Sequence, residues 1–446
     1  MEAKKKVLFL IPPTSGHINP LICIANELLK RNLHVVFFGN EKHRVSIEKS
    51  GVEYRAYSNF DMESMIIDSN DTPLNFFKLL LDTSSNLLPE LIKFCEEEQP
   101  DMIIYDQVSL HARYLINYLE IQQSKNKLNF KMPKHIFIFA SFATIGDLYP
   151  NKDELKIMIG GFSFKMIVDF IKLNIKQSKL NRKHGINFPF DLPKITGPGS
   201  DINLCCVFHE LQPRADNMID QIKFVGCCIV EDVRNIEVKN EKLNSILNEF
   251  EIINPSYLNS LNKKHEKKLI YASLGTLFNN KVNLNEKIID AFKILSQKNN
   301  KLEFLISVGK DNYELFKNKI NNKLLSIPDN ILILPSVPQI EILKRASLFI
   351  THAGMNSTSE TIHYGVPVIC LPLHADQPLV AIRICDELNF GKRLDTINFS
   401  PEQLSSSIIE VLNDQQYSNN ILEFTKISRK YDGIQNAANI IINSIK

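Results

Sequence analysis

Short apolar runs alternate along the chain with segments whose apolar residues recur at helical spacing. Residues 7–11 form the first run, and after a loop over 12–19 Pro20 stands where a proline commonly begins a helix. The apolar residues that follow repeat every three or four positions, which predicts an amphipathic helix. Further buried strands are predicted at 34–38, 102–105 and 136–140. Strands separated by helices favour right-handed crossovers and a parallel sheet.

The alternation stops over residues 231–268, a charged and Asn-rich segment typical of a linker, and then resumes. We therefore expect an α/β protein with two facing, Rossmann-like, doubly wound parallel-sheet domains, whose ligands bind in the crevice between them. The expected parts are a first domain at 1–230, the linker, a second domain at 269–425, and a C-terminal helix at 426–446 that packs back on the first domain. Strands of the second domain are predicted at 269–272, 304–308, 331–334, 348–350 and 368–371.

Residues 141–196 break the pattern. This stretch is rich in Phe, Ile and Met and contains the pair Gly160-Gly161. It is compatible with helices around a pocket or with an irregular part of the core.

Composition and charge exclude two classes of function. The formal net charge is +2 and the lysines are scattered, so a nucleic-acid partner is not expected. Apolar runs stay below the roughly 18 residues of a membrane helix, so a membrane partner is not expected either. We expect a soluble, cytoplasmic protein that is a monomer.

The segment from Ser336 to Gln377 carries the clearest chemistry. A predicted strand at 348–350 leads into Thr351-His352-Ala353-Gly354, and a helix opens near Asn356-Ser357. Free N–H groups and the positive dipole end of a helix N-terminus suit a phosphate. Glu360 lies one turn further on the same face, where a carboxylate suits the hydroxyls of a ribose. Ser and Asn also cap helices that bind nothing, so the turn alone leaves both interpretations open.

The wider set of motifs resembles the UDP-glycosyltransferases, and most closely the soluble bacterial-type macrolide glycosyltransferases. The C-terminal signature is H352-A-G-M-N-S357, E360, G365-V-P367, P372 and D376-Q377. The segments G16-H17-I-N-P20, Asp106 after a strand, L211-Q-P213, F224-V-G226 and S273-L-G-T276 are similar to other parts of that family, in the same order. The resemblance implies the two-domain GT-B fold, with the acceptor on the first domain and the donor on the second.

Carried over by position, the resemblance assigns the donor site. It implies that Gln339 and the backbone of Val337 meet uracil and that Glu360 holds the ribose hydroxyls. It places Asp376 and Gln377 on the sugar, and a Gln at the last position favours UDP-glucose. The diphosphate would be held by Thr276, His352, Gly354, Asn356 and Ser357.

Ser336 departs from the family pattern. Many members place an aromatic residue there that stacks on the base, an interaction worth about 1–3 kcal/mol. The chain has no Trp at all. We therefore expect a weaker contact with uracil, or another residue in that space.

His17 and Asp106 are the candidate catalytic pair. Transfer to a hydroxyl needs a base, and a histidine of ordinary pKa, about 6.5, suits that role. His17 is expected on a loop at a strand end, with Asp106 at the end of a neighbouring strand to orient it and stabilise its charge. UDP would leave from the opposite face, with inversion. His34, His111 and His374 are interpreted as surface or more distant groups.

The expected reaction is metal-independent and uses no cofactor besides the UDP-sugar co-substrate. Asp376 has no second carboxylate spaced as a D-x-D pair. The acceptor is expected to be a small apolar hydroxyl compound of the flavonoid, macrolide or xenobiotic type, as in detoxification or natural-product tailoring. Candidate walls of its pocket are Phe142, Ile145 and Phe162. Two alternatives remain, a UDP-sugar epimerase on the same fold and a non-catalytic nucleotide-sugar binder.

Overall fold

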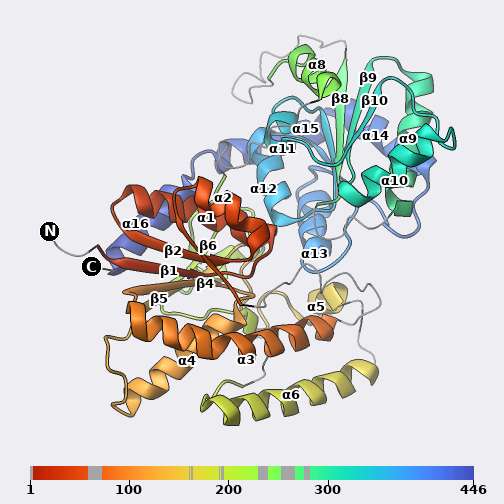
Figure 1. Cartoon of the computed structure of the whole chain (residues 1–446). Helices are drawn as coiled ribbons and strands as arrows, with labels where there is room; N and C mark the ends of the chain where they lie inside the picture. The colour runs from red at the N-terminus through yellow and green to blue at the C-terminus, as the bar shows by residue number, and fades with distance from the viewer. Residues whose placement is uncertain are drawn as a thin grey trace. The chain divides into compact units, whose positions relative to one another are not determined.

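The computed structural model describes residues 4–58, 73–159, 161, 164–189, 191, 195–229, 240–252, 267–275 and 282–445 (Figure 1). The chain divides into two compact units, one of Met1–Ile229 with Tyr431–Lys446 and one of Val230–Lys430. Each unit is a parallel sheet covered by helices, so the expected doubly wound α/β class is confirmed. Most of the segment expected as a linker, 231–239 and 253–266, lies outside the described residues.

The first unit is built on seven parallel strands among its described residues, in the order β3-β2-β1-β4-β5-β6-β7. The strands are β1 (Lys6–Leu10), β2 (His34–Gly39), β3 (Glu53–Ala56), β4 (Met102–Asp106), β5 (Lys134–Phe139), β6 (Asn203–Cys205) and β7 (Lys223–Phe224). The helices are α1 (Ser15–Lys30), α2 (Glu41–Lys49), α3 (Pro73–Glu98), α4 (Leu110–Ser124), α5 (Lys152–Ile159), α6 (Phe164–His184) and α16 (Gly433–Ile445), with a 3₁₀ turn at Ala215–Asn217.

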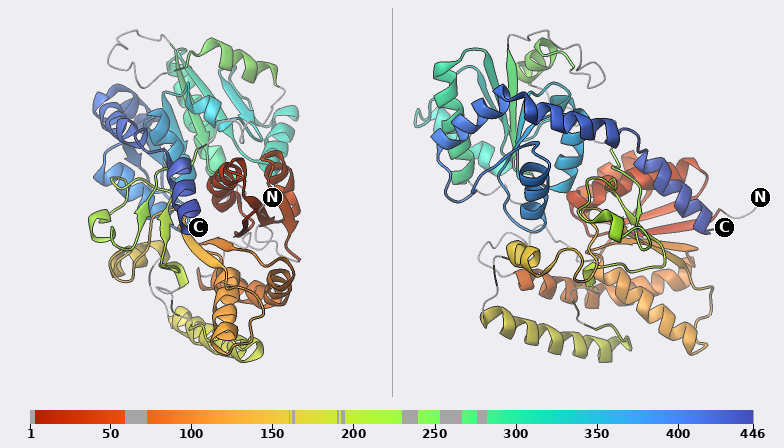
Figure 2. Two further views of the ribbon diagram at one scale, coloured as in Figure 1. Left: turned by 90° about the vertical axis from the view of Figure 1, so that its left-hand side faces the viewer. Right: turned by 180° about the vertical axis from the view of Figure 1, so that it is seen from behind.

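Helices cover both faces of this sheet, which explains why its central strands are continuous apolar runs. Helices α1, α2 and α16 lie on one face, and α3 and α4 lie on the other (Figures 1 and 2). The C-terminal α16 packs beside α1, where the Arg31 guanidinium donates to Asn439 Oδ1 at 2.6 Å. The strand order reverses between β1 and β4, so the carboxyl ends of these two strands flank the switch point, where such sheets bind ligands.

The first helix begins earlier than the sequence predicts. Helix α1 starts at Ser15, and Pro20 lies inside it rather than at its first position. The backbone N–H groups of His17 and Ile18 donate to the Thr14 carbonyl at 3.1 and 2.9 Å, so the turn is already closed there. The expectation that His17 lies on a loop is therefore wrong, because the residue belongs to the first turn of α1.

The second unit is built on six parallel strands among its described residues, in the order β10-β9-β8-β11-β12-β13. The strands are β8 (Lys268–Ser273), β9 (Leu302–Ser307), β10 (Ile331–Leu334), β11 (Leu348–Thr351), β12 (Val368–Cys370) and β13 (Gly391–Arg393). The helices are α8 (Glu241–Glu249), α9 (Val282–Lys298), α10 (Lys310–Asn321), α11 (Gln339–Leu343), α12 (Met355–Tyr364), α13 (Gln377–Ala381), α14 (Pro401–Asn413) and α15 (Gln415–Ser428), with a π-helical turn at Ile382–Glu387.

The second sheet has its own switch point, between β8 and β11. Its core is a set of apolar side chains between sheet and helices, in which Phe292 of α9 stacks on Phe304 of β9 at 4.6 Å between ring centroids. This packed core holds the turns after β8 and β11 in place. Both turns lie at the carboxyl edge of the sheet, where ligands of such sheets bind.

Candidate functional site

His17 lies just past the carboxyl end of β1, in the first turn of α1. Its Nδ1 is hydrogen-bonded to Oδ2 of Asp106, the last residue of β4. The His17 side chain stays 23% exposed while the Asp106 side chain is fully buried. The switch point of the first sheet thus brings together a carboxylate and a histidine that are far apart in the sequence, with the histidine on the solvent side.

Asp106 is held as a buried carboxylate. Its Oδ1 accepts hydrogen bonds from the Val108 N–H at 3.0 Å and the Ser109 hydroxyl at 2.8 Å. Burial alone would raise the pKa of the carboxyl, but the charge and hydrogen bond of His17 and the donors Ser109 and Val108 outweigh it. The pKa of Asp106 is therefore lowered, and the group is ionised at neutral pH.

His111, which we expected at the surface or behind the site, is buried near Asp106. It lies on α4, is 1% exposed, and its Nε2 lies 2.9 Å from the Tyr57 hydroxyl. Burial lowers the pKa of His111 to about 3, although the nearby charge of Asp106 acts in the opposite direction. The imidazole is thus neutral at pH 7. Its position on the helix that follows Asp106 was the only signal for it in the sequence.

His352 follows β11 in the second unit and is neutral as well. Burial lowers the pKa of His352 to about 4. Its Nδ1 is buried without a hydrogen-bond partner among the described residues. Because a buried N–H that lacks an acceptor costs about 1–3 kcal/mol, the favoured tautomer carries its proton on Nε2. His352 is therefore a neutral Nε2–H donor.

Two glycines make room for the His352 ring. A Cβ on Gly354 would lie 2.5 Å from Nε2, and a Cβ on Gly275 would lie 2.7 Å from the ring. Ala353, which stands between His352 and Gly354 in the sequence, has a φ of +63°, a left-handed conformation that few residues other than glycine adopt. Such strain is typical of turns that carry a function. The ring is thus clamped between the turns that follow β8 and β11.

Helix α12 begins directly after this turn. Its N-cap is Gly354, which supplies no side-chain hydrogen bond to the helix. The first-turn residues Asn356 and Ser357 are half-buried, and both carry side-chain donors. The N-terminus of α12 therefore has the backbone donors and dipole that suit an anion, with His352 beside it.

Gln339 and Glu360 form one hydrogen-bonded group rather than two separate ligands. The Gln339 Nε2 donates to Glu360 Oε2 at 2.6 Å and to the Ser357 hydroxyl at 3.2 Å. The Tyr271 hydroxyl, from β8, donates to Gln339 Oε1 at 3.1 Å. The Tyr271 ring stacks on Phe349 at 4.7 Å. Tyr271 was not singled out in the sequence, and it fixes which way the Gln339 amide faces.

The remaining donor residues differ in exposure. Ser336 is exposed and Val337 is buried, so the position where the family resemblance led us to expect an aromatic residue offers only a small hydroxyl. Gln377 is buried, and its Oε1 accepts from the backbone N–H groups of Leu373 and His374 at 2.9 and 3.1 Å. Gln377 thus closes the turn before α13 with its carbonyl, which leaves its NH₂ as the group able to donate. Asp376, half-buried, is the N-cap of α13.

Some predicted residues do not join these groups. Phe142 is 3% exposed and packs edge-on against Tyr149 at 5.8 Å, which is a core contact. Ile145 is half-buried and forms a short antiparallel bridge with Tyr149. Thr276 and Phe162 lie outside the described residues. His17 and Asp106 belong to the first unit, and the donor residues belong to the second.

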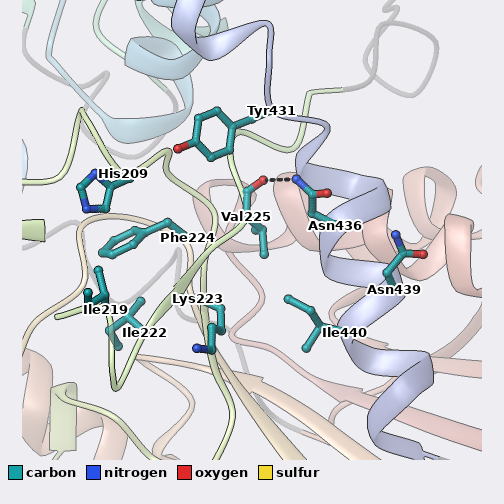
Figure 3. A pocket seen from close by; sticks show the side chains of 10 residues that line it. All are labelled: His209, Ile219, Ile222, Lys223, Phe224, Val225, Tyr431, Asn436, Asn439 and Ile440. Atoms are coloured by element: carbon teal, nitrogen blue, oxygen red, sulfur yellow. Dashed lines mark hydrogen bonds between the residues drawn. The ribbon is translucent and has the colours of Figure 1, made fainter. Parts of the chain in front are cut away.

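A pocket of about 550 Å³ lies elsewhere in the first unit, between β7 and α16 (Figure 3). Its walls include Phe224, Ile222 and Ile440, and Asn436 donates across it to the Val225 carbonyl at 3.0 Å. None of the predicted site residues lines it. The pocket therefore reflects how α16 docks against the sheet edge.

Two further features bear on function. Within the part of the chain that the structure describes, no helix is long and apolar enough to cross a membrane. The same described residues hold no cluster of three or more side chains arranged to ligate a metal ion.

Comparison with known proteins gives a consistent result. Residues 259–432 match the family model described as UDP-glucoronosyl and UDP-glucosyl transferase. An uncharacterized UDP-glucosyltransferase, YojK of Bacillus subtilis, is 24% identical over 99% of this chain and 97% of its own length. The NDP-glycosyltransferase YjiC of the same organism is 27% identical, over 96% of this chain and 94% of its own.

Solved structures agree on the fold. The glycotransferase of kitacinnamycin superposes with a TM-score of 0.70 at 19% identity and covers 99% of both chains. That likeness confirms the GT-B architecture expected from the sequence. The family match over residues 259–432 and the full-length relatives agree with the resemblance found in the sequence: the chain is similar to bacterial UDP-glycosyltransferases, and it is a glycosyltransferase that uses a nucleotide-sugar donor.

Proposed function

We propose that the chain transfers a sugar, with glucose preferred, from a UDP-sugar to a hydroxyl of a small apolar acceptor, with inversion at the anomeric carbon. The observation that carries the proposal is the contact between His17 Nδ1 and the buried Asp106 carboxylate. It gives the first unit a base with a fixed orientation, at the edge of the sheet where ligands of this fold bind.

The proton would move through His17. Because Asp106 is ionised and accepts from Nδ1–H, the lone pair of the neutral imidazole resides on Nε2. Nε2 takes the proton of the acceptor hydroxyl as its oxygen bonds to the anomeric carbon, and the bond to the UDP oxygen breaks. The imidazolium that results is stabilised by Asp106. General-base catalysis of this kind contributes about 10²–10⁴-fold.

The leaving diphosphate would be met by the second unit. His352 offers a neutral Nε2–H, and the N-terminus of α12 offers backbone N–H groups, with Asn356 and Ser357 beside them. Fixed donors of this kind stabilise developing negative charge without reorganising. We propose that Thr276 adds a further donor and that no metal ion or other cofactor is required.

The nucleoside and sugar would be read by the groups around Gln339. The Gln339 amide, oriented by the Tyr271 hydroxyl, would contact the base together with the Val337 backbone. Glu360, which accepts from Gln339, would contact the ribose. The Gln377 NH₂ and the Asp376 carboxylate would bind sugar hydroxyls, which supports glucose as the preferred sugar. Ser336 leaves the base unstacked. For the acceptor we propose an apolar flavonoid, macrolide or xenobiotic, with Ile145 near its pocket, and we propose a cytoplasmic, monomeric enzyme.

The test is product formation. The protein is incubated with UDP-glucose and a panel of phenolic and macrolide acceptors, and product mass and UDP release are measured with and without EDTA. We expect acceptor-dependent glucosides that persist in EDTA and are lost in His17→Ala, but not in the control His34→Ala, at a half-buried histidine paired with Glu53. Equal turnover in His17→Ala, or UDP binding without any acceptor-dependent release, would contradict the proposal.

A further inference from the structure

Helix α6 carries apolar side chains on the face turned to solvent. Phe164 is 80% exposed, Ile167 56%, Ile171 53% and Ile175 52%. Their spacing is that of one stripe along a helix. The residues that α6 buries, Met166, Leu173, Gln177 and Leu180, fall on the opposite side at 3.6 residues per turn. The helix is therefore apolar on both faces, and more than half of each side chain in the outer stripe is exposed.

The outer stripe stands away from the sheet. Helix α6 packs against α3, and α3 in turn lies between α6 and the sheet (Figures 1 and 2). His17 belongs to α1, on the other face of the same sheet. The stripe is thus separated from the catalytic pair by the sheet and a layer of helix.

Basic side chains follow one flank of the stripe. Over Phe164–His184 the chain has six basic residues and one acidic residue, Asp169. The row is Lys165, Lys172, Lys176, Lys179 and Lys183. Lys172 lies 3.6 Å from Asp169, Lys176 is paired with Asp82 of α3, and Lys183 donates to Ser85 of α3 at 3.4 Å. Lys165, at the first end of the row, and Lys179, within it, are exposed.

We propose that the outer face of α6 is a membrane-surface contact that takes an anionic lipid bilayer. A helix with bulky apolar residues on one face and lysines at its flank lies in the plane of the interface, with the apolar side chains in the acyl boundary and the lysines at the headgroups. Each lysine near an anionic surface strengthens partitioning about fivefold. The contact needs no spanning helix, and it holds whether or not the proposed reaction is correct.

The lysine row favours an anionic bilayer over a second copy of the chain as the partner of this face. An antiparallel pair of α6 stripes would bring two lysine rows together, which is unfavourable, whereas an anionic surface neutralises the row.

The test is flotation of the full chain with lipid vesicles. Wild type is mixed with vesicles of phosphatidylcholine alone, or of equal parts phosphatidylcholine and phosphatidylglycerol. The variants are Ile167→Glu/Ile171→Glu and Lys165→Glu/Lys179→Glu. Matched controls are Val45→Glu, an exposed apolar position on α2, and Lys49→Glu/Lys125→Glu. Thermal melts check that every variant is folded.

We expect wild type and both controls to float with the anionic vesicles only, and both α6 variants to partition at least tenfold less. Absence of flotation by wild type, or flotation of the α6 variants at the wild-type level, overturns the proposal. So does a dimer in light scattering that Ile167→Glu/Ile171→Glu dissolves, because the stripe then serves a second copy. A selective loss of vesicle-free turnover in that variant, with a water-soluble acceptor, would instead make the stripe an acceptor wall and also overturns it.

Discussion

Each unit places a histidine beside the switch point of its parallel sheet, but the surroundings of the two histidines are opposite in charge and exposure. In the first unit, His17 is partly exposed and contacts an ionised, buried carboxylate. In the second unit, burial holds His352 neutral and glycine backbone packs against its ring. A histidine that must change charge needs a counter-charge, and one that only donates a hydrogen bond needs a rigid, uncharged setting. The difference predicts that the first site moves a proton and the second binds an anion.

Asp106→Asn should have the largest effect. The Asn NH₂ would donate to Nδ1, so the imidazole proton would move to Nε2 and block its action as a base. We expect kcat to fall by about 10²–10⁴-fold while the Kd for UDP stays unchanged. Steady-state kinetics and calorimetry measure the two quantities. Asp101→Asn is the control, since Asp101 pairs with Lys5 away from the site. An equally large loss of UDP affinity would contradict the assignment of proton transfer to the first unit and donor binding to the second.

Gly354→Ala should damage the second unit instead. Its Cβ would come 2.5 Å from His352 Nε2, so the ring must leave its clamp. We expect the Kd for UDP to rise about 10- to 10²-fold, because a hydrogen bond to a charged group is worth about 1.5–3 kcal/mol. The control is Gly16→Ala, where a Cβ meets no atom within 4 Å, and its UDP affinity should match wild type. If both variants bind UDP normally, His352 does not contact the diphosphate.

Tyr271→Phe should have a smaller effect confined to donor binding. Removing the hydroxyl leaves Gln339 Oε1 without its donor, so the amide can turn away from the orientation it holds beside Glu360. We expect KM for UDP-glucose to rise about 3–10-fold, with kcat nearly unchanged. Tyr313→Phe, on α10 of the same unit, is the matched control. A fall in kcat at constant KM would show that Tyr271 serves the reacting centre and not the nucleoside.

The buried neutral histidines should also show in the stability of the fold. His111, with a pKa of about 3, takes up no proton between pH 7 and pH 5, whereas the unfolded chain, with a histidine pKa of about 6.5, does. The unfolded state therefore binds more protons in this window, and stability falls as pH falls. At pH 5 the loss is about 2 kcal/mol per such histidine. Urea unfolding at pH 7 and pH 5 should show a shallower loss in His111→Gln, and an identical loss would mean that His111 is protonated in the fold.

The sequence predicted the second unit better than the first, for a physical reason. His352, Gly354 and Glu360 lie within one strand-turn-helix segment, so their grouping follows from local structure. His17 and Asp106 meet only because β1 and β4 are neighbours in the sheet.

Other features had no local signal. Tyr271 was not singled out and His111 was expected at the surface or away from the site, because their hydrogen bonds reach partners far along the chain. The start of α1 was missed because Pro20, a common first helical residue, lies within that helix. Short strands such as β6 and β7 are fixed by pairing at the sheet edge, which no local pattern reports.

The most direct test of the proposed roles, proton transfer by the first unit and donor binding by the second, varies the acidity of the acceptor. Wild type and His17→Ala are compared with a nitrophenol that is already ionised at the assay pH and with a weakly acidic alcohol of similar size. If His17 removes the acceptor proton, His17→Ala loses about 10²–10⁴-fold with the alcohol and far less with the ionised phenol, at unchanged UDP affinity. An equal loss with both acceptors would contradict the role of His17 as the base.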